Sequence, residues 1–282
     1  MDYGKLIKDA LMIAWQKRYL WAFGFFAGAG LPNLNNRIIA GKAAELIAWL
    51  VANPEGLLAL LLSGLAVLLI FGGLRIISYG SLVAGVADSE RKISGNLETA
   101  LASGLKNFWR ILGLSIIFFT SIVLVLAFLL LPFFLMMIGS GSGMKAAGIL
   151  WLALMALPAL AALLWACLFR DYSRCFLILE DLNLRRSLAE AWRLMKQKPA
   201  ESFLLLIISL GMGLAIAIAT TAALAVLSLP FIFIGLLNKT LGLLLGLFCG
   251  IPLFVLITCV FGVYGSAYWT LGYLRLRASA AL

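Results

Sequence analysis

Arginine and tyrosine side chains recur together near the ends of apolar stretches, and these residues are the ones best suited to binding chemistry. Arg75 lies four residues before Tyr79, and Arg170 and Arg174 lie on either side of Tyr172. Guanidinium groups form charge-assisted hydrogen bonds with phosphate and carboxylate oxygens, and tyrosine hydroxyls add neutral ones. The pattern predicts contacts with an anionic lipid head group near one membrane face. The alternative is that the arginines are anchors whose charge reaches the head-group region.

A third tyrosine, Tyr264, continues the pattern without an arginine beside it. It follows Tyr172 by 92 residues, and Tyr172 follows Tyr79 by 93. Each of the three precedes Gly-Ser or Ser, which marks them as equivalent positions. The sequence therefore predicts a ring of three hydroxyls. The arginines that could serve the third place, Arg275 and Arg277, come only further along the chain, which argues against full threefold symmetry.

Catalytic and metal-binding residues are scarce. The sequence has no histidine, the commonest metal ligand and a frequent general base. Its twelve acidic residues lie outside the centres of the apolar stretches, whereas ion-coupled carriers keep ionisable groups at depth. Because no phosphate-binding loop or nucleophile motif occurs either, we expect a noncatalytic protein without a cofactor. The four cysteines lack metal-site spacing, and we expect free buried thiols at Cys167, Cys175, Cys249 and Cys259.

Composition places these residues in a membrane protein. Of the 282 residues, 64% are hydrophobic and only 12% are charged, which is too much apolar surface for a soluble core. We predict an all-α polytopic integral membrane protein with about six transmembrane helices. The first apolar stretch is short, because Lys17-Arg18 and Pro32 bound it, so it must tilt, borrow from the preceding helix or fail to cross. The six stretches are residues 19–31, 56–74, 108–138, 146–169, 202–237 and 241–263.

The distribution of basic residues predicts the orientation. Of the 22 lysines and arginines, all but Arg37, Lys42, Lys145 and Lys239 fall on the side that holds both termini. Cytoplasmic segments carry an excess of lysine and arginine, so we expect both termini in the cytoplasm of a prokaryote with the chain in its plasma (inner) membrane. A nucleic-acid partner is not expected despite the net charge of +10, because the basic residues interleave with acidic ones.

Three short amphipathic helices are predicted just before apolar stretches, over residues 4–18, 96–110 and 183–198. Trp15, Leu105 and Trp192 hold matching places in them. We therefore predict a single transmembrane domain of three tandem units, residues 1–92, 93–181 and 182–282. Basic side chains on such helices can meet anionic head groups, or the helices can dock on neighbouring spans. In the third helix these side chains are Arg185, Arg186, Arg193 and Lys196.

Two further patterns concern packing. Gly242, Gly246 and Gly250 are spaced four residues apart at the start of the last apolar stretch, which predicts close helix–helix approach. Residues 36–51 read as another amphipathic segment, at the outer side of the membrane.

The sequence Ala-Trp-Arg-Leu-Met-Lys from Ala191 to Lys196, its echoes upstream and Tyr-Gly-Ser-Ala-Tyr from Tyr264 to Tyr268 carry a family resemblance. The chain resembles uncharacterised prokaryotic six-span membrane proteins related to the membrane domain that precedes some glycerophosphodiester phosphodiesterases. The catalytic domain of those enzymes is absent. The resemblance implies an integral membrane fold and transfers no catalytic residue.

Together these patterns predict a scaffold or lipid-contacting subunit. Its expected partners are membrane lipids, anionic ones in particular, and either another membrane protein or further copies of the chain. The alternative is a small-solute or lipid transporter with a path between the repeat units. Its polar lining would come from Thr120, Ser121, Thr220 and Thr221.

Overall fold

The computed structural model describes residues 2–28, 53–91, 93, 95–138 and 141–280, and every regular element in these ranges is a helix. This confirms the predicted all-α class. The short helices are α1 (Tyr3–Gln16), η1 (Arg18–Leu20), α2 (Trp21–Gly28), α5 (Leu97–Lys106) and α8 (Leu184–Gln197). The long helices are α4 (Pro54–Glu90), α6 (Phe108–Ile138), α7 (Ser142–Leu179), α9 (Pro199–Leu237) and α10 (Lys239–Ala280).

All five long helices are long and apolar enough to cross a membrane. The shortest, α6, has 31 residues and is therefore about 46 Å long, against a hydrocarbon thickness of about 30 Å. The chain is thus a multi-pass membrane protein, with parts of its long helices reaching beyond the bilayer core. The first predicted span is described only through α2, which has eight residues. The predicted amphipathic segment at residues 36–51 lies outside the described residues.

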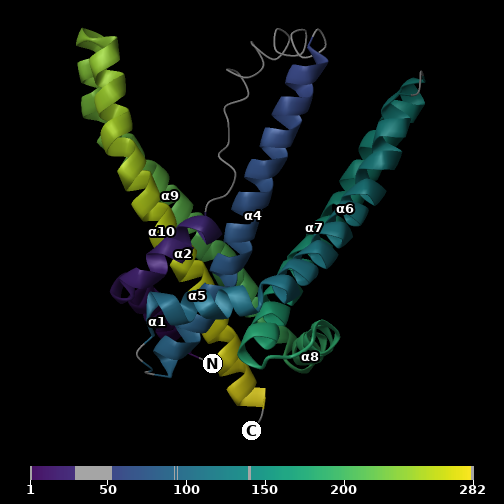
Figure 1. Ribbon diagram of the computed structural model, residues 1–282. Coiled ribbons are helices and arrows are strands. Elements are labelled where there is room, and N and C mark those ends of the chain that lie inside the picture. Colours follow the sequence, from purple (N-terminus) through teal and green to yellow (C-terminus); the bar gives the residue numbers. More distant parts are fainter. Residues whose placement is uncertain (1, 29–52, 92, 94, 139–140, 281–282) are drawn as a thin grey trace.

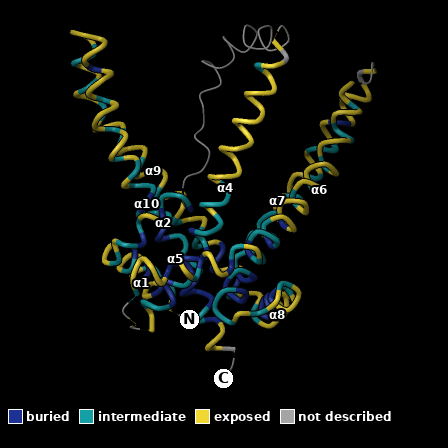
Figure 2. The backbone as a smooth tube through the Cα atoms, in the orientation of Figure 1, coloured by how far each residue is buried: buried dark blue, intermediate teal, exposed yellow. Residues whose placement is uncertain are grey.

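The helices form a packed end from which three arms diverge (Figure 1). The arms are α4, the α6–α7 pair and the α9–α10 pair. Each pair is a helical hairpin whose two consecutive helices contact one another. The packed end, here called the base, holds the short helices and both chain termini. Figure 2 shows that buried residues gather in the base, whereas the arms are exposed over most of their length.

Three short helices of the base each pack on a long helix, which directly precedes α5 and α8 in the sequence but lies at the other end of the chain from α1. α1 contacts α10, α5 contacts α4, and α8 contacts α7. Small residues four apart make these contacts possible, because they let two helices approach closely. The buried pairs occupy matching places in the three helices: Ala10 and Ala14, Ala100 and Gly104, Ser187 and Ala191.

Local sequence explains where the short helices begin and end. The Asp2 side chain caps α1 by accepting a hydrogen bond from the Lys5 backbone N–H, at 3.0 Å. Asn96 and Thr99 form a capping box at the start of α5. α5 and α8 are each joined to the following long helix through a single residue, Asn107 or Lys198. Each short helix can therefore turn sharply out of the direction of the span that follows it.

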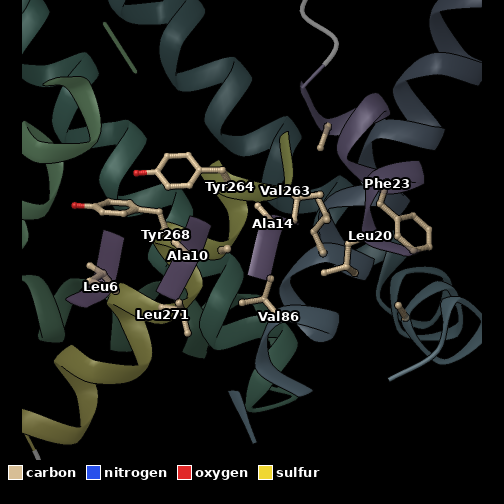
Figure 3. Close-up of a cluster of buried hydrophobic side chains, with 14 of the residues drawn as sticks. Leu6, Ala10, Ala14, Leu20, Phe23, Val86, Val263, Tyr264, Tyr268 and Leu271 are labelled. Carbon is tan, nitrogen blue, oxygen red and sulfur yellow. The ribbon is translucent and has the colours of Figure 1, made fainter. Parts of the chain in front are cut away.

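The main hydrophobic core lies between α1, α2 and the C-terminal half of α10. Figure 3 shows Leu6 and Ala10 of α1 beside Tyr268 and Leu271 of α10. The Tyr268 hydroxyl donates to the Leu205 carbonyl of α9 at 2.9 Å, so its buried polar atom is satisfied. A second core forms where α8 meets α7, with Leu194 and Met195 among its buried residues.

The glycines of α10 differ in how closely another helix approaches them. A Cβ placed on Gly242 would lie 2.5 Å from the Gly235 Cα of α9, so the two backbones touch there. A Cβ placed on Gly246 would have the Phe231 Cβ as its nearest neighbour, at an ordinary 3.6 Å. A Cβ placed on Gly250 would have no atom of another helix within 4 Å. The tight approach predicted for all three glycines is therefore limited to Gly242, because α9 and α10 separate beyond it.

The closest helix–helix contact involves glycines that the sequence pattern did not single out. Gly24 and Gly28 of α2 are four residues apart and face Gly262 of α10. A methyl group at Gly262 would overlap the Gly24 carbonyl, and one at Gly28 would lie 2.8 Å from the Thr258 carbonyl oxygen. α2 is thereby held directly against α10, although it has only eight residues.

Candidate functional site

A cavity of about 270 Å³ lies where α2, α4, α7 and α10 meet in the base. Its polar side chains come from three of these helices, and its remaining walls are apolar or glycine. The polar residues are Tyr79 of α4, Arg170, Asp171 and Arg174 of α7, and Ser266 and Thr270 of α10.

Two arginines share one carboxylate in this cavity. Arg170 Nε and Arg174 Nη1 each lie 3.3 Å from the same oxygen, Asp171 Oδ1. The three side chains are 31%, 11% and 17% exposed, for Arg170, Arg174 and Asp171 respectively. Because two guanidinium groups face one carboxylate, one positive charge is left without a counter-charge from this trio. The Arg174 Nε–H is buried and has no hydrogen-bond partner among the described residues.

Tyr79 connects this pair to α2 and to a third arginine. Its hydroxyl donates to the Ala27 carbonyl at 3.2 Å and accepts from Arg75 Nη2 at 3.5 Å. The Arg174 guanidinium lies 4.6 Å from the centre of the Tyr79 ring, and that of Arg75 lies 5.7 Å from it. Both distances are within the range of cation–π attraction. The structure therefore brings Arg75, Tyr79, Arg170 and Arg174 into one cluster.

Two hydroxyl-bearing residues of α10, Ser266 and Thr270, line the cavity one helical turn apart. Ser266 Oγ and Thr270 Oγ1 are buried, and neither has a hydrogen-bond partner by geometry in the described part of the chain. Thr270 lies beside the Cys175 thiol, which is a weak hydrogen-bonding group. Buried polar atoms usually find partners, whereas these two hydroxyls and the Arg174 Nε–H, from residues that line one cavity, have none by geometry among the described residues.

The other two tyrosines of the predicted ring face elsewhere. Tyr172 is fully buried, and its hydroxyl lies 3.3 Å from Ser202 Oγ of α9. Tyr264 packs beside Tyr268 in the main core (Figure 3). The reason is helical phase, since residues two apart point to nearly opposite sides of a helix. Arg170 and Arg174 therefore share the face that Tyr172, between them, cannot reach.

Helical phase also identifies the residues that the sequence pattern missed. Tyr264 lies two residues before Ser266, so Ser266 and Thr270 occupy the opposite face of α10, the one that lines the cavity. The signal was present in the sequence as a Ser and a Thr four residues apart. The late arginines, in contrast, serve the base: Arg275 pairs with Asp9 of α1, and Arg277 pairs with Glu180 at the end of α7.

The four basic residues predicted on the third short helix are all on the surface of the base. Arg185, Arg186, Arg193 and Lys196 are exposed, whereas Ser187, Ala191, Leu194 and Met195 on the same helix, α8, are buried. Lys196 Nζ lies 5.2 Å from the centre of the Trp192 ring. α8 is thus docked on α7 by one face and presents basic groups on the other.

Large apolar side chains are exposed at matching places of the three short helices. Trp15 is 61% exposed, Leu105 is 52% exposed and Trp192 is 44% exposed. Each directly follows the second buried small residue of its helix, namely Ala14, Gly104 or Ala191. One side chain therefore docks the helix while its neighbour projects outward.

An ion-pair cluster joins α5 and α6 to the segment after α7. Lys106 Nζ lies 3.0 Å from Asp181 Oδ2, and Arg110 pairs with the other oxygen of this carboxylate. Hydrogen bonds from Lys106 and then Arg110 hold the pKa of Asp181 below its usual value. Asp181 has a φ of 50°, in the left-handed region, which aspartate and asparagine tolerate better than most residues.

The acidic and cysteine side chains of the described residues do not gather into a metal-binding group. All four cysteines are free thiols, and within the described ranges no group of three or more cysteine, aspartate and glutamate side chains could hold a metal ion.

Comparisons with protein-family models, with curated proteins and with solved structures found no match. The resemblance to the membrane domain that precedes glycerophosphodiester phosphodiesterases therefore stays a prediction.

Proposed function

We propose that the chain is a noncatalytic scaffold of a prokaryotic plasma membrane, and that its base binds anionic lipid at the cytoplasmic leaflet. The observation that carries the proposal is the repeated design of the short helices. Each buries small residues against a long helix and exposes a large apolar side chain, Trp15, Leu105 or Trp192, at the same place. Tryptophan is typical of the membrane interface, where its ring meets both lipid tails and head groups.

The basic residues of the base supply the charge for this contact. α8 alone exposes Arg185, Arg186, Arg193 and Lys196 around Trp192. Near an anionic bilayer each such residue contributes about 1 kcal/mol, and salt screens the attraction within a Debye length. Four residues on one short helix therefore favour an anionic surface over a zwitterionic one.

We further propose that three tandem units close into a ring. In this arrangement the short helix of each unit docks on the last long helix of the preceding unit: α5 on α4, α8 on α7, and α1 on α10. The matching buried pairs of small residues support it. A sixth crossing is supported by the path of the chain, because α2 lies in the base whereas α4 begins at the far end of its arm (Figure 1).

A transport path between the units has less support. Ser121 and Thr221 donate to carbonyls of their own helices four residues earlier, at 2.8 Å in both cases. Hydroxyls bonded in this way support the helix they belong to, and these two lie exposed on arms that diverge. We therefore retain the scaffold as the proposed function.

Replacing Arg185, Arg186, Arg193 and Lys196 together with glutamine tests the lipid contact. We expect the variant to insert normally, because no long helix is changed, and to retain less anionic lipid than the wild type in native mass spectra. The difference should shrink as salt is added. Lys145→Gln with Lys239→Gln is the matched control, because it removes basic residues at the far ends of two arms. Equal retention of anionic lipid by the quadruple variant and the wild type would refute the proposal.

A further inference from the structure

We infer that the cavity between α2, α4, α7 and α10 binds a phosphate group. This site is separate from the exposed basic face of α8, because its lining residues come from α2, α4, α7 and α10. It goes beyond surface attraction, since a partly enclosed site selects a chemical group by its geometry. One molecule would therefore be bound at a defined place.

The charges of the cavity call for an anion. Arg170 and Arg174 face the single carboxylate of Asp171, and Arg75, whose guanidinium lies 5.7 Å from the centre of the Tyr79 ring, has no carboxylate partner in the described residues. An arginine side chain donates hydrogen bonds and accepts none, so this cluster has few free oxygens that could bind a cation. The carboxylate keeps both guanidinium groups oriented, which reduces the ordering that a bound anion would require.

The unpartnered donors select an anion with several oxygens. Arg174 on α7 and Ser266 and Thr270 on α10 line the same cavity from two helices, and their Nε–H and hydroxyl groups would reach a bound anion after small side-chain rotations. A tetrahedral phosphate can accept from both sides at once, and arginine binds phosphate in a bidentate manner. Filling these donors would remove the cost of leaving them buried and unsatisfied.

The size of the cavity fits a head group rather than a whole lipid. About 270 Å³ lies just below the range of about 300–1,000 Å³ that is typical of small-molecule sites. Its apolar walls include Val83, Phe261 and Trp269, which suit the carbon atoms attached to a phosphate ester. The phosphate could belong to a lipid or be free inorganic phosphate, and the experiment separates these sources.

The test uses the full chain in mild detergent, with phosphatidic acid in mixed micelles in one arm and inorganic phosphate in the other. Binding is followed by native mass spectrometry for the lipid and by isothermal calorimetry for inorganic phosphate. Diacylglycerol, which lacks the phosphate, is the ligand control. Saturable binding of the lipid alone assigns the phosphate to a lipid, and binding of inorganic phosphate assigns it to a free anion. No binding in either arm would overturn the inference.

Two variants locate the binding. Ser266→Ala with Thr270→Val removes one unpartnered hydroxyl and one whose only neighbour is the weakly bonding Cys175 thiol, so the unliganded protein should lose little stability while affinity falls roughly tenfold or more. Arg174→Gln should weaken binding further. The control, Thr221→Val with Ser228→Ala, removes hydroxyls bonded to their own helices on an arm and should leave affinity unchanged.

The hydroxyl variant decides the outcome even if Arg174→Gln fails to fold. Unchanged affinity in Ser266→Ala with Thr270→Val would show that any bound phosphate lies elsewhere, and the inference would be wrong. The quadruple glutamine variant of α8 leaves this cavity intact. It should therefore lose surface lipid and keep the saturable phosphate, which separates failure of this inference from failure of the proposed function.

Discussion

The base and the arms use their side chains in opposite ways. In the arms, the most apolar window of each long helix has at most 11% of its residues buried within the chain. In the base, small and hydroxyl-bearing residues are buried, among them Ser78, Ser81 and Ser173, which are at most 2% exposed. The most hydrophobic parts of the chain are therefore the least packed.

Hydrophobicity and packing therefore have separate roles in this protein. Apolar length places a helix in the bilayer, but lipid tails are as apolar as leucine, so it gives helices little reason to associate. Close backbone contact, hydrogen bonds and ion pairs must hold the base together instead. The Gly24–Gly262 contact, the Tyr268 hydrogen bond and the Asp9–Arg275 pair are examples.

The largest expected effect comes from breaking backbone contact in the base. Gly262→Ala should lower the free energy of unfolding by about 1–3 kcal/mol, because the added methyl group overlaps the Gly24 carbonyl and forces α2 away from α10. Gly250→Ala is the matched substitution in the arm, where no atom of another helix lies within 4 Å of the added Cβ, and it should not lower stability, because alanine has a higher helix propensity than glycine. Chemical denaturation in mixed micelles measures both.

Equal losses of unfolding free energy in the two glycine variants would contradict this difference between the base and the arms. They would mean that the arms are packed as tightly as the base, against α9 or against another molecule. Equal tolerance would mean instead that α2 is not held against α10 in the membrane.

A smaller effect is expected at Asp181, because its ion pairs with Lys106 and Arg110 are exposed. Since these partners lower the pKa of Asp181 in the folded state, its contribution to stability is full above the unfolded value of about 3.9. The contribution is lost as the pH falls through the lower, folded pKa.

Asp181→Asn keeps a residue that tolerates the left-handed backbone and removes the titration. Its melting temperature should therefore fall less steeply than that of the wild type below about pH 4. Parallel melting curves of the two proteins over this range would show that the pair contributes nothing. Glu55→Gln, at the far end of α4, is the control in an arm and should melt like the wild type throughout.

Much of the division of the chain into long apolar helices and short helices could be predicted from the sequence. Hydrophobicity over about 20 residues depends on composition alone, and five of the predicted spans are found as long helices. Three of the short helices, α1, α5 and α8, were also predictable, because their apolar residues recur at helical spacing.

The arrangement of the base could not be predicted in the same way. The packing of α1 and α2 on α10 depends on contacts between residues at opposite ends of the chain. The Gly24–Gly28 pair lies in a stretch interpreted only as a short span. The predicted tyrosine ring is wrong for a different reason, since equal spacing along the chain does not place residues on a shared face. Counting helical phase from Arg170 and Arg174 would have turned Tyr172 away from the cavity.

The central claim is that the base lies at the cytoplasmic face and the arms cross the bilayer, and cysteine labelling tests it most directly. Lys145→Cys and Lys239→Cys, at the far ends of two arms, and Arg186→Cys, in the base, are each placed in a chain whose four native cysteines are replaced. In cells with an intact inner membrane, an impermeant thiol reagent should label positions 145 and 239, and should reach position 186 only after permeabilisation. Labelling of position 186 in intact cells, with positions 145 and 239 protected, would contradict the account.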